Sequence, residues 1–197
     1  MRQANTVQTG IPPLYKIRRQ GELKMIRFPA VILPTLAFLL PLSSFPQDIR
    51  EATDVTAIDI DAFIDALPTD SISDQAIRVV DVGGYNIGIF GVFRPQNLPG
   101  RPIRHQTSVT EIYYIVSGTG TLVTGGTIDQ EESTGNSRLT GRPNFAGSGI
   151  SSGTSRQVVP GDIIVIPGNT PHWFSSLDTD IRYLIFRPDP ESLLQLK

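Results

Sequence analysis

An acidic residue stands at the start of a strongly apolar stretch of the sequence. Glu111 opens the run EIYYIV, and burying a carboxylate among apolar side chains is costly unless a cation meets it. A metal ion is one such cation. Residues of the same parity along this stretch point to one face of an extended segment. They are His105, Thr107, Val109, Glu111 and Tyr113. The spacing therefore predicts that an imidazole and a carboxylate share one face of a sheet.

The second of the chain's two histidines follows a turn that prolines stiffen. The run DIIVIP (162–167) is β-branched and predicts a strand, and the sequence PGNTP that begins at Pro167 predicts a turn. His172 then opens the next strand. Because proline fixes its own backbone angle φ, the prolines of this turn are expected to determine where His172 points.

These two segments resemble the two motifs of the cupin superfamily, which read G-x5-H-x-H-x(3,4)-E-x6-G and G-x5-P-x-G-x2-H-x3-N. The matching residues are His105, Glu111 and Gly118 in the first motif and Gly161, Pro167 and His172 in the second. Gly100 precedes the first motif at a spacing one residue shorter than the family's. The resemblance covers residues 75–187 and implies a small jelly-roll β-barrel with a metal site inside its mouth.

The resemblance implies a reduced set of metal ligands, namely His105, Glu111 and His172. Two imidazoles and a carboxylate suit non-haem iron, and the implied cofactor is one divalent ion of Fe, Mn, Ni or Zn. Thr107 replaces the family's second histidine and is suited to hydrogen-bonding a metal-bound water rather than to ligation. Two further motif positions differ, Asn169 for glycine and Ser176 for asparagine. The alternative is a barrel without metal, in which His105 and Glu111 form an ion pair.

Other side chains near the motifs are candidates for contact with a ligand. Tyr113 has the parity of Glu111 and is interpreted as a pocket residue that serves as a general acid. Arg94, Arg101 and Arg104 precede the first motif. They are interpreted either as a group that attracts an anionic substrate or as solvated surface.

Three functions are compatible with these residues. The first is a mononuclear metal enzyme of oxygenase, isomerase or lyase type that acts on a small organic molecule in the barrel. The second is a non-catalytic protein that binds a small molecule without metal. The third is a storage-like protein. The fold alone does not choose among these functions. Cupins commonly dimerise, so the resemblance also implies a homodimer.

The elements that must position these residues are short strands. Six apolar, β-branched runs are each bounded by Gly, Pro, Asp or Asn: 76–82, 85–93, 109–118, 120–125, 162–167 and 181–186. Gly118-Thr119-Gly120 reads as a tight hairpin turn between two of them. One helix is predicted where Ile60, Phe63, Ile64 and Leu67 repeat at helical spacing, with Asp59 as its cap and Pro68 at its end. The fold class is therefore all-β, a cupin-type double-stranded β-helix with one short N-terminal helix.

The chain divides into four parts. Residues 1–24 form a basic extension, which makes Met25 a candidate for the true start, and residues 25–44 read as a signal peptide with a short apolar core. Residues 45–74 form an arm with the helix, and residues 75–190 form the barrel. Within it, residues 127–157 are rich in Gly, Ser and Thr and read as a solvated, mobile insertion or as a lid. The signal predicts a secreted or periplasmic protein with no stable membrane span after processing.

Composition excludes several classes of protein. The chain of 197 residues contains no cysteine, which excludes disulfides, thiolate zinc sites, iron–sulfur clusters and cysteine nucleophiles. A net charge of −2 gives no basic footprint, so nucleic acid is not expected as a partner.

Overall fold

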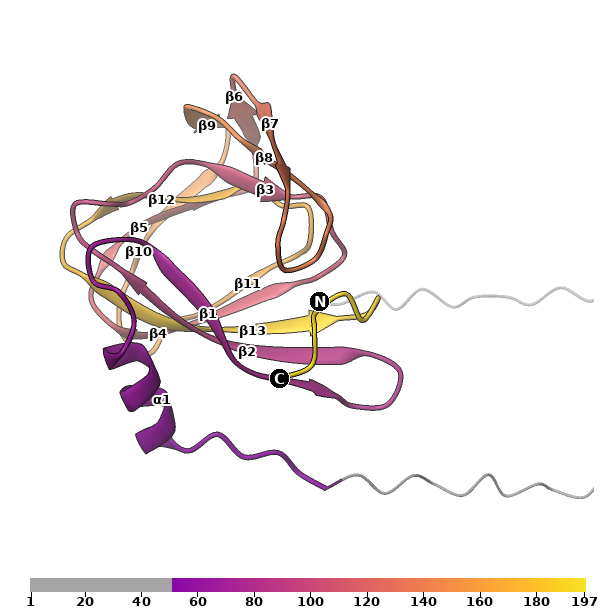
Figure 1. Ribbon diagram of the computed structural model, residues 1–197. Helices are drawn as coiled ribbons and strands as arrows, with labels where there is room; N and C mark the ends of the chain where they lie inside the picture. Colours follow the sequence, from indigo (N-terminus) through magenta and orange to yellow (C-terminus); the bar gives the residue numbers. More distant parts are fainter. Residues whose placement is uncertain (1–50) are drawn as a thin grey trace, which may run out of the picture. The chain divides into compact units, whose positions relative to one another are not determined.

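The computed structural model describes residues 51–197, which fold into two facing antiparallel sheets, a two-stranded ribbon and one helix (Figure 1). The first sheet contains, in order, β1 (Ser73–Asp81), β2 (Asn86–Arg94), β13 (Ile181–Asp189), β4 (Glu111–Ser117) and β11 (Ile163–Ile166). The second contains β10 (Thr154–Val158), β5 (Gly120–Thr124), β12 (His172–Leu177), β3 (Ile103–His105), β8 (Pro143–Ala146) and β7 (Glu132–Asn136). The ribbon pairs β6 (Thr127–Asp129) with β9 (Gly149–Ser151).

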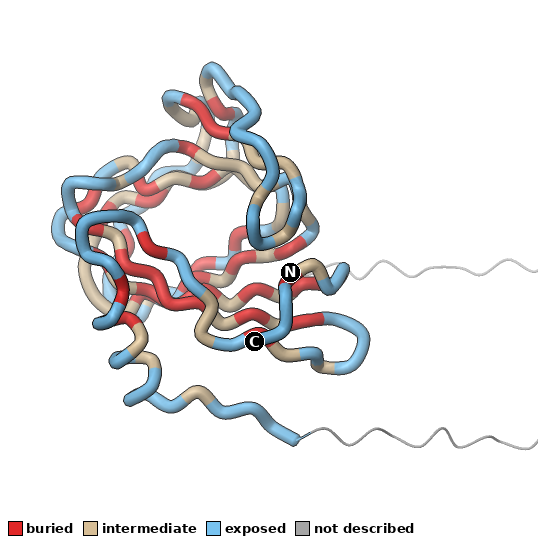
Figure 2. Tube along the Cα trace, viewed as in Figure 1, coloured by how far each residue is buried: buried red, intermediate tan, exposed pale blue. Residues whose placement is uncertain are grey.

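The main core lies between the two large sheets. Buried residues occur along strands of both sheets (Figure 2). The first sheet supplies Phe90, Ile115 and Tyr183, and the second supplies Leu122 and Phe174. Alternating burial along β4 and β12 matches strands that have one face in this core. Two antiparallel sheets closed around such a core form the jelly-roll, double-stranded β-helix architecture of cupins, which confirms the predicted fold class.

Helix α1 (Ala57–Asp65) covers the outer face of the first sheet. Its apolar side chains, including Ile64, pack against Phe93 and Leu184 as the helical spacing predicted. The cap differs from the prediction: Thr56 is the N-cap, and Asp59 closes a reciprocal capping box with it. The helix ends before Pro68, because the residue preceding a proline is disfavoured in helical conformation.

The predicted strands are present with boundaries shifted by a few residues, but the predicted hairpin at Gly118-Thr119-Gly120 is wrong. Strands β4 and β5 do not pair; β4 pairs with β11 and β13, whereas β5 pairs with β10 and β12. The chain crosses from one sheet to the other at this point. Gly118 has φ of +85° and lies so close to the carbonyl of Asp180 that a Cβ would stand 2.0 Å from its oxygen. The tight turn therefore serves a crossing between sheets rather than a hairpin.

The segment 127–157, predicted to be a solvated, mobile insertion or a lid, forms β6 to β9 and most of β10. β8 pairs with β3, and β10 pairs with β5, so the segment extends the second sheet on both sides. Its solvation is as expected: every residue of β7 is exposed. Polar strands at a sheet edge have no hydrophobic alternation, and the sequence pattern therefore missed them.

Some predictions fall outside the described residues or concern more than one chain. The basic extension 1–24 and the signal peptide 25–44 lie outside residues 51–197. No helix within the described range is long and apolar enough to span a membrane. The homodimer stays a prediction.

Candidate metal centre

His105 and Glu111 approach each other across the barrel and do not share a sheet face, which corrects the prediction from parity. His105 ends β3 in the second sheet, the chain leaves strand conformation at residues 106–110, and Glu111 begins β4 in the first sheet. Glu111 and Tyr113 do point to the same side of β4, and both are buried. The connection between the sheets therefore brings the two predicted ligands together.

The proline-flanked turn joins the second motif to the first. The Asn169 N–H donates to the His105 carbonyl at 3.1 Å. Gly168 lies so close to the loop after β3 that a Cβ on it would be 2.2 Å from the Thr107 carbonyl oxygen. Asn169 has φ of +63°, which explains how it replaces the motif's glycine, since Asn tolerates this region better than most residues. His172 follows at the start of β12 and is buried.

His105, Glu111 and His172 offer donor atoms that all lie within 4.8 Å of one another. His172 Nε2 is 3.5 Å from Glu111 Oε2, and the two imidazole rings are 5.5 Å apart between centroids. Ligands at about 2.0–2.2 Å from one ion lie roughly 3–4 Å apart. The widest separation, up to 4.8 Å, therefore needs to shorten by about 1–2 Å for the three side chains to share an ion.

Both imidazoles are held by their Nδ1 atoms. His172 Nδ1 lies 3.0 Å from the Thr170 carbonyl, which can only accept, so Nδ1 carries the proton and Nε2 keeps a free lone pair. His105 Nδ1 lies 2.8 Å from Asn144 Oδ1 on β8, which gives the same tautomer. Histidines that bind metal ions typically donate their other N–H in this way. The donor set therefore fits a divalent ion.

Glu111 already has a cationic partner in Arg187, which the sequence interpretation did not include. The guanidinium donates to Glu111 Oε1 from Nε at 3.0 Å and from Nη2 at 2.8 Å, and it also binds Asp74 on β1. Burial by itself would raise the pKa of Glu111, but attraction to Arg187, His172 and His105 outweighs it and lowers the pKa to about 2. Glu111 is therefore an anion at neutral pH, with Oε2 facing His172.

Tyr113 donates its hydroxyl proton to Glu111 Oε2 at 3.0 Å. Burial, followed by the nearby charge of Glu111, raises the pKa of Tyr113 well above its usual value, so the hydroxyl stays protonated. Burial lowers the pKa of His172, although Glu111 opposes this shift, and the ring therefore favours the neutral form that can bind a metal.

Thr107 borders the same region but does not belong to the group of three donors. It follows β3, and its Oγ1 accepts from the Val109 N–H at 3.2 Å. The hydroxyl thus stabilises the loop between β3 and β4.

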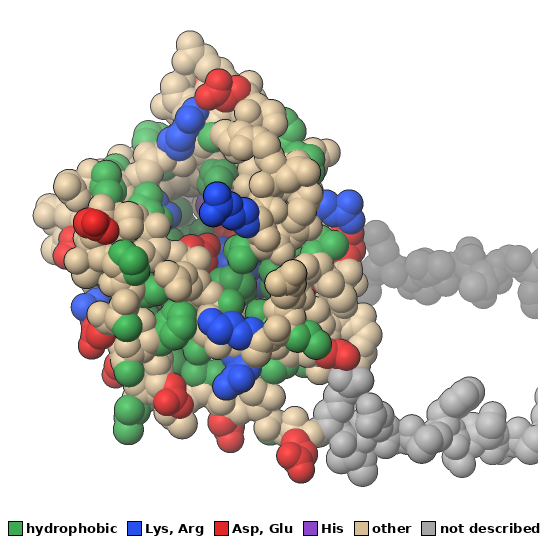
Figure 3. Space-filling view, viewed as in Figure 1, with side chains coloured by type: hydrophobic (Ala, Val, Ile, Leu, Met, Phe, Trp, Pro, Cys, Tyr) green, Lys and Arg blue, Asp and Glu red, His purple; other side chains and the backbone are tan. Residues whose placement is uncertain are grey.

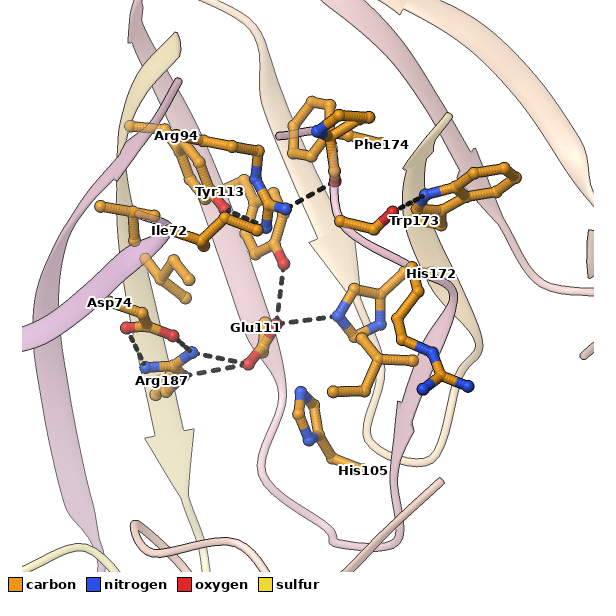
Figure 4. A pocket seen from close by; sticks show the side chains of 17 residues that line it. Ile72, Asp74, Arg94, His105, Glu111, Tyr113, His172, Trp173, Phe174 and Arg187 are labelled. Carbon is orange, nitrogen blue, oxygen red and sulfur yellow. Dashed lines mark hydrogen bonds and ion pairs between the residues drawn. The ribbon is translucent and has the colours of Figure 1, made fainter. Parts of the chain in front are cut away.

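The three donors open into a cavity of about 310 Å³ between the sheets (Figure 4). Four aromatic side chains, those of Tyr113, Trp173, Phe174 and Tyr183, line it together with aliphatic residues. Its charged residues are Asp74, Arg94, Arg101, Glu111 and Arg187. Lys and Arg side chains lie beside the hollow on the face shown in Figure 3. A cavity of this size accommodates a small organic molecule.

The arginines before the first motif have different environments. Arg101 forms an exposed ion pair with Glu132, and Arg104 binds Glu131 and the Asn169 side chain. Arg94 lies in the cavity wall and has no carboxylate partner among residues 51–197. Only Arg94 and Arg101 of these three line the cavity.

Sequence reasoning missed three supporting residues, Asp74, Asn144 and Arg187. Arg187 was detectable, because Ile181, Tyr183 and Ile185 alternate into the core and Arg187 continues their parity, yet the predicted strand ended at 186. A charge at a core position signals a buried ion pair. Asn144 lies in the Gly/Ser-rich segment, where no pattern distinguishes it.

The chain is similar to several solved structures at low identity. DMSP lyase DddQ from Ruegeria pomeroyi DSS-3 has 19% identity and a TM-score of 0.42, over 74% of this chain and 70% of that one. A double-stranded β-helix protein from Klebsiella pneumoniae has 12% identity and a TM-score of 0.42, over 74% and 97%. An RmlC-like cupin from Methanocaldococcus jannaschii has 11% identity and a TM-score of 0.36, over 64% and 89%. No protein-family model and no curated protein matches the sequence.

Proposed function

We propose that this chain, which has the fold and the motif spacing of cupins, binds one divalent metal ion and acts as an enzyme on a small organic molecule. The observation that carries the proposal is the convergence of His105, Glu111 and His172, with both imidazoles held by Nδ1 so that Nε2 is free. The proposed reaction is of oxygenase, isomerase or lyase type.

The surrounding residues have separate tasks in this proposal. A bound ion supplies Lewis acidity or oxygen activation to a ligand in the cavity. Arg187 and Tyr113 hold the Glu111 carboxylate from two sides, and Asn144 fixes the His105 ring. The aromatic wall excludes water around the ligand. The role of Tyr113 as a general acid stays a prediction.

The test is the metal content of the full chain, purified without a histidine tag and measured by mass spectrometry. We expect close to one equivalent of iron, manganese, nickel or zinc per chain. Protein that holds no metal, even after anaerobic reconstitution with each ion, would contradict the proposal.

A binding protein without metal is the second candidate, and one observation favours it. Arg187 already compensates the buried charge of Glu111, so the carboxylate needs no metal to be stable. Asp74, Arg187 and Glu111 together nevertheless carry a net charge of −1, so electrostatic attraction still favours the binding of a metal cation. The metal measurement separates the two candidates.

We further propose that the protein is secreted or periplasmic, from the apolar run between Met25 and Ser44 alone. Processing is expected to remove this run, so the mature protein should begin close to residue 45. N-terminal sequencing of the protein recovered from its host checks this. A mature protein that retains residues 28–41 would contradict a cleaved signal.

A further inference from the structure

Arg94 is a cation in the cavity wall that has no anionic partner among residues 51–197. Its Nη1 donates to the Pro99 carbonyl at 2.7 Å, and its Nη2 donates to the Tyr183 hydroxyl at 3.3 Å. The guanidinium lies over the Phe174 ring, 5.2 Å from the centroid. Within residues 51–197 no carboxylate pairs with it, whereas Arg101 and Arg104 each bind one and Arg187 binds two.

The guanidinium retains donors for a ligand. An arginine has five N–H groups, and the contacts of Arg94 within the described residues use two of them. The buried Nε has no hydrogen-bond partner among the described residues. Each Nη atom uses one of its two N–H groups, so one N–H on each Nη remains for a ligand. Arg94 is partly exposed, and it lines the cavity. A guanidinium with two free Nη donors matches the geometry of a carboxylate.

Arg94 lies at one end of the cavity, and the three metal-donor side chains lie at the other. Tyr113 contacts Glu111 through its hydroxyl, and its ring lies 4.8 Å from that of Tyr183, which contacts Arg94. Glu111 pairs with Arg187 near the end of β13, while Arg94 pairs with Ile181 at the start of this strand. A ligand between the two ends lies against aromatic rings (Figure 4).

Charge also favours an anion at this place. Of the three arginines that line the cavity, Arg101 is paired with Glu132, and the other two, Arg94 and Arg187, balance the carboxylates of Asp74 and Glu111. Binding of a divalent ion adds two positive charges in a largely apolar enclosure. An anionic ligand offsets this excess, while a cationic or neutral ligand does not.

From the geometry we infer that the ligand is a small organic carboxylate with an apolar body, and that Arg94 binds its carboxylate. The body lies along Phe174, Tyr183 and Tyr113, and the far end faces His105 and His172. This inference deepens the proposed function by naming a ligand class, and it rests on that function for the charge of the ion and for the end of the ligand that faces the metal, whereas the binding of the carboxylate by Arg94 does not depend on it.

The test compares benzoate with benzamide, which has the same shape without the charge, by calorimetric titration of the full chain. We expect benzoate to bind at least about tenfold more tightly than benzamide, and Arg94→Met to abolish this preference. Arg94→Lys retains the charge but loses the two-pronged donor, and it should keep a reduced preference. Arg101→Met is the matched control, because Arg101 lines the same cavity but pairs with Glu132, and its preference should be unchanged.

The experiment distinguishes a wrong role for Arg94 from the absence of metal binding. The titrations are repeated on His172→Ala and on chelator-treated protein, with circular dichroism to show that each variant is folded. A preference that survives metal loss, is reduced in Arg94→Lys and disappears only in Arg94→Met supports the inference even where no metal binds. If the preference for benzoate needs the metal and persists in both folded Arg94 variants, the ion binds the carboxylate and the inference is wrong. Equal binding of benzoate and benzamide to the wild type would also overturn the inference.

Discussion

Replacing His172 by alanine is expected to weaken metal binding by at least about 100-fold. Removing a group that only orients a metal ligand typically weakens metal binding roughly 10–100-fold, and removing the ligand itself should cost more. His172 supplies one of three donor atoms, and within the described residues no further His, Cys, Asp or Glu belongs to this group. Glu111→Ala should have an effect of the same order. Metal content after dialysis against a weak chelator, followed by titration with zinc, measures both.

Two further variants make this test specific. Asn144→Ala removes the acceptor that orients His105 and should weaken metal binding about 10–100-fold, while leaving all three ligands in place. Phe174→Leu changes a side chain on the same face of β12 that has no donor atom, and it should bind metal as the wild type does. Unchanged metal content in His172→Ala would show that the metal, if bound, lies elsewhere.

Replacing Arg187 by methionine is expected to destabilise the metal-free protein by about 3–5 kcal/mol. The substitution removes the cation shared by Glu111 and Asp74 and leaves Glu111 buried without compensation. Arg182→Met is a matched control on the same strand, because Arg182 forms an ion pair with Asp65 at the surface. An exposed pair contributes at most about 1 kcal/mol. Urea denaturation of the two variants compares the free energies of unfolding, and equal losses would contradict the assigned role of Arg187.

The same contact predicts how stability depends on pH. Arg187, His172 and His105 lower the pKa of Glu111 from 4.5 to about 2 against the opposing effect of burial. A carboxyl whose pKa is lower in the folded state stabilises the fold above its unfolded pKa, and this contribution is lost as the pH falls from about 4.5 to about 2. In Arg187→Met the loss in this range should be smaller, because the cation that lowered the pKa is absent. Denaturation of metal-free protein across this range measures the difference.

The sequence predicted the identity of the donor residues better than the reason for their proximity. His105 and Glu111 were expected on one face because of their parity, but the chain leaves β3 and crosses between the sheets before it reaches Glu111. Parity holds only within one continuous strand, and the break at residues 106–110 removes it. The motif spacing remained informative because it reflects the turns that bring the two segments together, as the contact between Asn169 and His105 shows.

The supporting residues were harder to predict because they come from distant parts of the chain. Asp74, Asn144 and Arg187 reach the site through pairings of strands that are far apart in sequence, namely β2 with β13, β3 with β8 and β4 with β13. Likewise, β7 and β8 carry few apolar residues, and their place in the sheet depends on the pairing of β8 with β3 and of β7 with β8 rather than on burial. Local periodicity carries no signal for either kind of contact.

The three donor side chains come from both walls of the barrel, His105 and His172 from the second sheet and Glu111 from the first. An ion held by all three would act as a cross-link between the sheets, so that its binding energy becomes folding energy. By linkage, an ion present at 100 times its dissociation constant adds about 2.7 kcal/mol to the free energy of unfolding. The melting temperature would then report the supply of free metal around the protein, and metal scarcity would shorten the lifetime of the folded chain.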